Sequence, residues 1–251
     1  MSTLDAHTAV GLVELEEAMA DGWWPLEHAW LGRWLQRSSA GFTGRGNSTL
    51  PLGDPGLPLV AAVDRVEAFY RSRGLRPRFA VPSPVVGDVS AGPLVAELQR
   101  RGYAAETPTV VMTAPTAAIA RDTDVQILER PDDAWLSVYR YRDQPLPPAA
   151  GALLVSAPHQ RFAAVVDEGE TVAVGRVAVS RGWGGITAMQ VAGSHRGRGL
   201  ARDVLAALAA HALSAGATGL YLQVALENTA ARTLYSSAGF ANHHGYHYRL
   251  L

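Results

Sequence analysis

Apolar residues recur at helical spacing in several segments of the chain. The strongest pattern lies in residues 200–214, where Leu200, Val204 and Leu208 share one face and Gly216 follows the last turn. Residues three and four apart lie on the same side of a helix, so this spacing predicts a helix packed through that face. Weaker patterns of the same kind, bounded by glycine or proline, predict helices over residues 59–73, 92–101, 132–141, 149–156 and 229–238.

Runs rich in valine and alanine lie between these segments and predict strands. They cover residues 76–81, 109–113, 161–166, 171–179, 185–191 and 219–225, and the aromatic C-terminal segment predicts one more. Residues 38–58 are rich in glycine, serine and proline and predict a long loop with room for one short strand, whereas residues 114–124 predict a linker between two halves of the chain.

The two halves end on a similar pattern. Residues 94–113 (LVAELQRRGYAAETPTVVMT) and 231–250 (ARTLYSSAGFANHHGYHYRL) each read as a helix, a glycine-aromatic pair and a strand. Two interpretations stay open at this point. The pattern is either a weak internal repeat or a common way of ending a helix before a strand.

Composition narrows the class of protein. The 251 residues carry a net charge of -1 and are 48% hydrophobic, which is typical of a globular protein without general affinity for nucleic acid or membranes. No apolar run approaches the roughly 20 residues of a transmembrane helix and no signal-peptide pattern opens the chain, so we expect a cytoplasmic protein. The chain has no cysteine and no lysine, which excludes a cysteine nucleophile and a Walker-type phosphate loop.

The candidate chemistry begins in the segment QVAGSHRGRGLARDVLAAL (190–208), where a predicted strand leads through glycines into a helix. Unpaired amides and the helix dipole at such a junction are suited to a diphosphate, and Arg196 and Arg198 add positive charge. Two glycines alone more often mean only a turn. A dinucleotide fingerprint is the nearest rival, but Gly197 and Gly199 are not followed by its third glycine.

A second candidate segment, ENTAARTLYSSAGF (227–240), follows the strand over residues 219–225. Asn228 and Tyr235 are seven residues apart, which places them about 20° apart around a helix and lets them face one site. An amide and a phenol arranged in this way can bind a ligand and pass a proton. The alternative is that Asn228 is a helix cap and Tyr235 a core aromatic.

Together these segments resemble the GNAT (GCN5-related) N-acetyltransferase superfamily. Its signature, Arg/Gln-x-x-Gly-x-Gly/Ala, is matched by residues 196–201 (RGRGLA), although Gly193 replaces a proline often found before it. The later pattern Asn-x-x-Ala-x-x-Leu-Tyr-x-x-x-Gly-Phe is matched in full by residues 228–240. The resemblance covers roughly residues 185–240, and the weaker strands from residue 124 onward are consistent with it.

The resemblance implies a mixed α/β (α+β) fold with two GNAT-like domains in tandem and a central mixed sheet flanked by helices. Residues 1–118 would be a degenerate domain and residues 124–251 the catalytic domain. In the first half, residues 53–58 (GDPGLP) bring prolines without amide donors and an aspartate of the wrong charge for a phosphate. We expect this half to form one wall of the acceptor site. Its tryptophans could contribute to that wall, but such spacing is more often core: Trp23, Trp24, Trp30 and Trp34.

The resemblance also implies an acetyl-coenzyme A site. The glycine loop would hold the diphosphate through backbone amides, the strand end would pair with the pantetheine arm, Asn228 would contact pantetheine or the acetyl end, and Tyr235 would protonate the departing thiolate. The residues expected to bind acetyl-CoA are Met189, Gln190, Val191, Arg196, Gly197, Arg198, Gly199, Leu200, Ala201, Asn228 and Tyr235.

The expected reaction is direct attack of a primary amine in a ternary complex, since no cysteine exists to carry the acetyl group. We expect a small-molecule acceptor; a protein N-terminus or lysine, a longer acyl group, or a non-catalytic acyl-CoA sensor stay open, as does monomer or homodimer. No metal is expected, because His243, His244 and His247 lack a completing carboxylate or cysteine. The general base is not identified, and its candidates are Glu227, His159, Asp167 and His211.

Overall fold

The computed structural model describes residues 11–90, 92–106, 108–140 and 144–251. Within these ranges a nine-stranded sheet has the order β4-β12-β6-β11-β10-β9-β8-β7, with β5 beside β12. The pair β10–β11 is parallel and the other neighbours are antiparallel, so the sheet is mixed as predicted. Its strands are β4 Arg78–Ser83, β5 Ala104–Ala105, β6 Thr109–Pro115, β7 Gln126–Leu128, β8 Gln160–Asp167, β9 Glu170–Ser180, β10 Trp183–Val191, β11 Gly219–Ala225 and β12 Ala241–Leu250.

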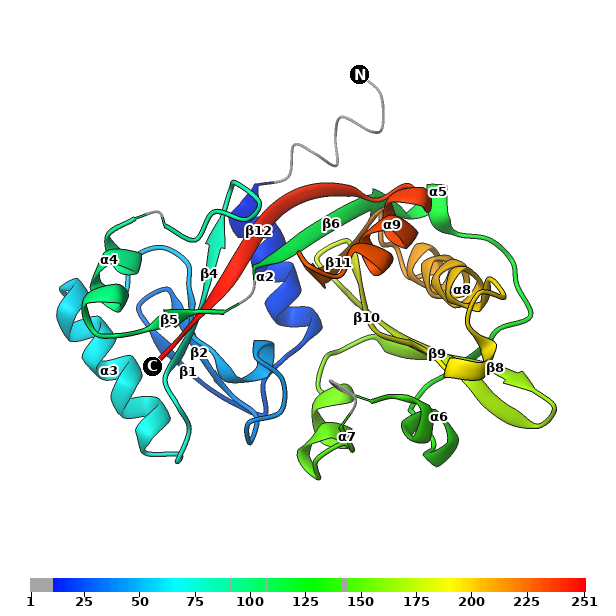
Figure 1. Ribbon diagram of the computed structural model, residues 1–251, viewed down its shortest axis with the longest axis horizontal. Coiled ribbons are helices and arrows are strands. Elements are labelled where there is room, and N and C mark those ends of the chain that lie inside the picture. The colour runs from blue at the N-terminus through cyan, green and yellow to red at the C-terminus, as the bar shows by residue number, and fades with distance from the viewer. Residues whose placement is uncertain (1–10, 91, 107, 141–143) are drawn as a thin grey trace, which may run out of the picture.

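A small second sheet and the helices complete the architecture (Figure 1). The small sheet has the order β1-β2-β3, built from Glu27–Leu31, Trp34–Ser38 and Leu50–Pro51. The helices are α2 Leu12–Gly22, η1 Arg45–Asn47, α3 Leu59–Arg71, α4 Pro93–Arg100, α5 Thr116–Ile119, α6 Asp133–Val138, α7 Ala149–Leu154, η2 Gly193–His195, α8 Leu200–Ser214 and α9 Thr229–Ser237. Among the described residues, no helix is both long enough and apolar enough to cross a membrane.

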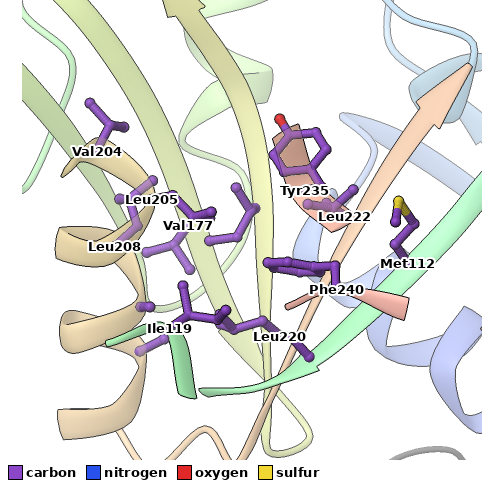
Figure 2. Close-up of a cluster of buried hydrophobic side chains, with 14 of the residues drawn as sticks. Met112, Ile119, Val177, Val204, Leu205, Leu208, Leu220, Leu222, Tyr235 and Phe240 are labelled. Carbon is purple, nitrogen blue, oxygen red and sulfur yellow. The ribbon is translucent and has the colours of Figure 1, made fainter. Parts of the chain in front are cut away.

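Helices cover both faces of the sheet around β8 and β9. Ala163 belongs to the core formed with α8, whereas its neighbours Phe162 and Ala164 belong to the core formed with α6 and α7. Successive side chains of a strand point to opposite faces, so this alternation places the two helix layers on opposite sides. Val177, Leu205 and Leu220 belong to the α8 core, which Figure 2 shows in close-up.

The two halves of the chain exchange their last strands. Strand β6 follows the glycine-aromatic pair of the first half but lies against β11, and β12 ends the second half but lies against β4. The exchanged strands are also paired with each other, with Tyr246 opposite Thr109. Both halves therefore contribute to one continuous sheet, and the helix-glycine-aromatic-strand pattern read from the sequence exists in each.

The predicted elements agree with the structure best in the second half. Residues 200–214 and 219–225 are helix α8 and strand β11 with the predicted bounds. The predicted linker over residues 114–124 is wrong in its first part, because α5 lies there and Ile119 is buried in the α8 core. The helix expected over 132–141 is observed only over Asp133–Val138, and its predicted last residue lies outside the described ranges.

His247 in β12 makes the folded state sensitive to acid. The side chain is buried, and its Nε2 accepts a hydrogen bond from Nε of Arg249 at 3.2 Å. Burial, reinforced by the charge of Arg249, lowers the pKa of His247 to about 4. Above the unfolded-state pKa of about 6.5 both states are neutral; as the pH falls toward 4 only the unfolded state gains the proton, so stability is lost in this window.

We therefore expect His247→Gln to be less acid-sensitive than the wild type. The glutamine amide cannot be protonated but can still accept the hydrogen bond from Arg249. The wild type should lose up to about 3 kcal/mol from this one group between pH 6.5 and 4. Denaturant unfolding at several pH values measures the difference, and parallel stability curves for the two proteins would contradict the assignment.

Candidate functional site

The predicted glycine loop joins β10 to α8 at one edge of the sheet. The turn η2 follows β10, and Gly197 and Gly199 then adopt left-handed φ angles of 79° and 86°. A Cβ built on either glycine meets no heavy atom within 4 Å. Glycine is therefore required here by the backbone conformation, and the space above both residues is open.

The amides of this loop are available to a ligand. Arg202 donates its amide to the carbonyl of Gly199 at 2.8 Å. In the described chain, by contrast, the amides of residues 197–201 donate to no acceptor. Free amides at a helix start, combined with the dipole of a helix of 15 residues, favour an anion.

A cavity of about 520 Å³ lies over these amides, and we call it the loop cavity. Its guanidinium groups differ in their partners. Arg196 is exposed and makes no ion pair within the described residues, whereas Arg202 donates to Oγ of Ser237 at 2.9 Å. Arg198 does not line the cavity and instead pairs with Asp167 at 2.9 Å. The lining residues are Val191, His195, Arg196, Gly197, Gly199, Leu200, Ala201, Arg202, Ala230, Ala231 and Leu234.

Strands β10 and β11 diverge next to the loop cavity. Their parallel pairing runs from Trp183 and Gly219 to Ile186 and Leu222 and ends there. The outer edge of β10 continues to pair with β9, with a register shift between Thr187 and Gln190. Ala188 inside this bulge has a left-handed φ of 54°, a conformation that costs about 1 kcal/mol for a residue with a Cβ. The bulge thus holds open a gap between two strand edges.

A second cavity of about 290 Å³ occupies this gap, and we call it the splay cavity. It adjoins the loop cavity, because Ala231 lines both. Of the predicted strand residues, Met189 and Gln190 line the splay cavity and Val191 lines the loop cavity. The lining residues are Arg45, Tyr139, Arg140, Ile186, Thr187, Ala188, Met189, Gln190, Leu222, Gln223, Val224, Ala225, Asn228, Ala231 and Tyr235.

Asn228 and Tyr235 both line the splay cavity, as their spacing predicted. Asn228 caps α9, since its Oδ1 accepts the amide of Ala231 at 3.0 Å, so the capping interpretation also holds and leaves the amide nitrogen for a ligand. The ring of Tyr235 packs against Phe240 with centroids 5.9 Å apart. Figure 2 shows the hydroxyl of Tyr235 pointing away from Phe240 and Leu222.

The phenol of Tyr235 is a protonated group that lines the splay cavity. Burial raises the pKa of Tyr235 to about 12, so the hydroxyl is protonated throughout the neutral range. Burial is the only cause of this shift, and no hydrogen bond joins the hydroxyl to another described residue. A ligand in the splay cavity would therefore meet a hydrogen-bond donor that no described residue engages.

The candidates for a general base do not line the splay cavity. Glu227 is exposed beside the cap, and Asp167 is engaged by Arg198 and by His195, whose Nε2 lies 3.3 Å away. His159 precedes β8 at the end opposite Asp167, and His211 lies in the last turn of α8. Among the described residues, no group of three or more His, Asp or Glu side chains is arranged to hold a metal ion.

Several cavity residues come from segments that the sequence did not connect with the site. Arg45 lies in η1 within the predicted loop over residues 38–58, and Tyr139 and Arg140 follow α6. Gln223 lies on β11 and accepts a hydrogen bond from the Tyr246 hydroxyl at 3.2 Å. No local pattern marks these positions, because only tertiary packing brings them to the gap, and for Arg45 this is the packing of the first half against the second.

The tryptophans of the first half differ in burial. Trp23 and Trp34 are buried in core clusters, whereas Trp30 is 58% exposed.

Comparison with family models and curated relatives covers nearly the whole described chain. Residues 11–249 match the model described as "Probable histone acetyltransferase Rv0428c C-terminal". The chain is 32% identical over 239 residues to the probable histone acetyltransferase Rv0428c of Mycobacterium tuberculosis, covering 92% of this chain and 70% of the relative. It is 27% identical over 262 residues to the uncharacterized N-acetyltransferase YobR of Bacillus subtilis, covering 94% and 97%.

Solved structures show the same fold at low sequence identity. A GCN5-related N-acetyltransferase from Kribbella flavida superposes with a TM-score of 0.70 at 14% identity, covering 96% of each chain. A tandem GNAT protein from the clavulanic acid biosynthesis pathway superposes with a TM-score of 0.61 at 12% identity, covering 99% of this chain and 91% of the other. The predicted mixed α/β fold, with a central mixed sheet flanked by helices, is confirmed.

Proposed function

Since this chain belongs to the family described as "Probable histone acetyltransferase Rv0428c C-terminal" and is a GNAT-type N-acetyltransferase, we propose that it transfers the acetyl group of acetyl-CoA to a small-molecule primary amine. One observation carries the proposal. An anion-binding helix start adjoins a gap between diverging strands, and a buried phenol faces that gap. Acetyl-CoA needs these three features in this order: a site for its diphosphate, a gap for its extended pantetheine arm, and a proton donor for the leaving thiolate.

The loop cavity would hold the diphosphate of acetyl-CoA. The free amides of residues 197–201 provide donors directed at an anion, and Arg196 adds an unpaired positive charge. The side chain of Arg198 contributes less directly, since Asp167 neutralises it. The unpaired edges of β10 and β11 beyond Ile186 and Leu222 offer amide and carbonyl groups to the pantetheine arm.

Tyr235 would assist departure of the thiolate. A thiol has an unperturbed pKa of about 8.5, so a phenol with a pKa of about 12 is the weaker acid by roughly three units. Full transfer of its proton is therefore favourable only if the phenolate regains a proton in the same step. We propose that the amine nitrogen attacks the thioester carbonyl, Tyr235 donates to the sulfur, and the amine proton returns to Tyr235 through water.

The first half would take no CoA and would form one wall of the acceptor site. We propose that residues 1–118 are a degenerate GNAT-like half and residues 124–251 the catalytic half. In the segment before α3, the Gly56 amide is already engaged, because it donates to the carboxylate of Asp54 at 2.8 Å. The carbonyl of Asp54 accepts the Arg33 amide. This half supplies Arg45 to the splay cavity.

A protein acceptor is the second candidate, favoured by the name of the Mycobacterium tuberculosis relative. The test mixes the protein with acetyl-CoA and either a panel of small primary amines or a histone-tail peptide, and it measures release of free CoA thiol. We expect thiol release with small amines and no acetylated protein in their absence, by intact-mass measurement. Release only with the peptide would favour the second candidate, and binding without transfer to any acceptor would favour a sensor.

A further inference from the structure

The splay cavity carries positive charge without a compensating acid. Arg45 and Arg140 line it, and its described lining includes no aspartate, glutamate or histidine. Arg140 is exposed, whereas Arg45 is half-buried. An unpaired guanidinium that is partly removed from water is costly, and such groups usually lie near a carboxylate. We therefore look for the partner of Arg45 in a ligand.

Arg45 is held in place without using its hydrogen-bond donors. Its guanidinium carbon lies 4.7 Å from the ring centroid of Trp23, and that ring is fixed by a hydrogen bond from Nε1 to Oγ1 of Thr43 at 3.1 Å. Arg45 is half-buried and makes no hydrogen bond or ion pair within the described residues. Stacking on an aromatic face orients the planar fork and leaves its N–H groups directed elsewhere.

The surroundings of Arg45 reinforce the positive field. Arg176 lies on the same tryptophan ring at 4.9 Å and is fully buried; burial lowers its pKa to about 10, which still leaves it charged at neutral pH. Arg37 is also buried, and its guanidinium donates to the carbonyl and the hydroxyl of Ser48, both at 2.9 Å. Glu16 lies with Arg37 and Arg45 around a neighbouring cavity of about 20 Å³, but its carboxylate is engaged by His244 at 3.0 Å.

We propose that the acceptor is a small amine that also carries a carboxylate, and that Arg45 binds this carboxylate with help from Arg140. The inference rests on the proposed function and specifies the acceptor of the same site. The guanidinium fork matches a carboxylate with two parallel hydrogen bonds. The splay cavity of about 290 Å³ would also take the end of the pantetheine arm, so the room left beside Arg45 suits an acceptor no larger than an amino acid.

The same charges affect the attacking amine. A nearby guanidinium disfavours the ammonium form and so lowers the pKa of an amine bound beside it. The neutral fraction that can attack the thioester rises without a carboxylate base in the cavity lining. A lysine-rich peptide would instead bring many positive charges toward Arg45 and Arg140, so the cavity discriminates against it.

The test compares matched acceptors that differ only in the anionic group. For several carbon skeletons, an amino acid, its amide and the corresponding diamine are each offered with acetyl-CoA, and kcat/KM is measured from thiol release. The amino group of the amide loses its proton more readily than that of the amino acid. Intrinsic reactivity alone would therefore favour the amide, so a preference for the amino acid must come from the protein. We expect the amino acid to be preferred by about 10- to 100-fold, the range of a charged hydrogen bond.

Variants of Arg45 attribute that preference to its charge. Arg45→Gln should lose the preference mainly through KM, Arg45→Lys should keep part of it, and Arg45→Glu should shift preference toward the diamine. Acetyl-CoA affinity, measured by calorimetry, should be unchanged in all three, and far-UV circular dichroism checks that they are folded. An unaltered preference in Arg45→Gln would overturn the assignment of Arg45.

Calorimetry with acetyl-CoA distinguishes failure of the acceptor assignment from failure of the proposed function. If wild type binds acetyl-CoA but acetylates amides or diamines as well as amino acids, the inference fails and the proposed function stands. Acetyl-CoA binding with no acetylation of any amino acid in the panel also overturns the inference. Absence of acetyl-CoA binding to the folded wild type overturns the proposed function and the inference with it.

Discussion

Replacement of Gly199 by aspartate is expected to abolish acetyl-CoA binding while the protein remains folded. Gly199 is the residue before α8, with φ 86° and ψ -8°, and a Cβ there meets no protein atom within 4 Å. The left-handed conformation costs aspartate about 1–2 kcal/mol, which is small against a typical stability of 5–15 kcal/mol. The fold should therefore survive the substitution.

The loss of affinity should come from charge as well as bulk. A carboxylate beside the free amides of residues 197–201 would occupy the place proposed for the diphosphate. Two like charges about 4 Å apart repel by roughly 4 kcal/mol at the effective dielectric constant of a protein surface, which corresponds to about a thousandfold in affinity. Isothermal titration calorimetry with acetyl-CoA measures the change.

Gly199→Asn is the matched control for this experiment. Asparagine has the same shape as aspartate, tolerates the left-handed region equally well and is an equally good residue before a helix. We expect its affinity to fall by about tenfold through loss of close backbone approach, much less than for aspartate. Equal affinities of the two variants would mean that no anion binds next to Gly199.

Removal of the hydroxyl in Tyr235→Phe is expected to lower kcat by about 10²- to 10⁴-fold, the usual contribution of a positioned proton donor. The hydroxyl makes no hydrogen bond to a described residue, and the ring contact with Phe240 at 5.9 Å does not depend on it. Stability and acetyl-CoA affinity should thus stay near wild type. Because the pKa of Tyr235 is about 12, the rate loss should be constant between pH 7 and 9.

Tyr221→Phe controls for the loss of a buried phenol as such. Burial also raises the pKa of Tyr221 to about 12, but its hydroxyl donates to the carbonyl of Ala18 at 3.4 Å and Tyr221 does not line the splay cavity. Its kcat should remain within a few-fold of wild type. A similar rate loss in both variants, or none in Tyr235→Phe, would remove Tyr235 from the proposed mechanism.

The sequence predicted the structure correctly wherever the residues of a short segment by themselves require one local conformation. The apolar stripe of residues 200–214 requires a helix, and the positive φ angles of Gly197 and Gly199 require residues without a Cβ. A seven-residue spacing suffices to place Asn228 and Tyr235 on one cavity. These features depend on neighbours a few residues away, so they can be read from a linear chain.

Fewer secondary-structure elements of the first half were predicted from the sequence. Helix α2 and strands β1 and β2 had no predicted counterpart. The expected loop over residues 38–58 contains β3, in agreement with the short strand allowed there, but it also contains η1, which was not predicted. The signal is weak because these elements pack through mixed surfaces. In β2, for example, buried positions include Gln36 and Arg37 beside Trp34 and Leu35, which hides the alternation expected of a half-buried strand.

The sequence by itself thus determined the glycine loop before α8, the helix that carries Tyr235 and the order of elements in the second half. Only the tertiary structure decided which strands pair, since a strand sequence specifies its faces but not its partner. The exchange of β6 and β12 and the packing of α2 depend on contacts between residues far apart in the chain. That packing brings Arg45 to the same cavity that Tyr235 lines, because distance in space, unlike spacing along a helix, is set by the whole fold.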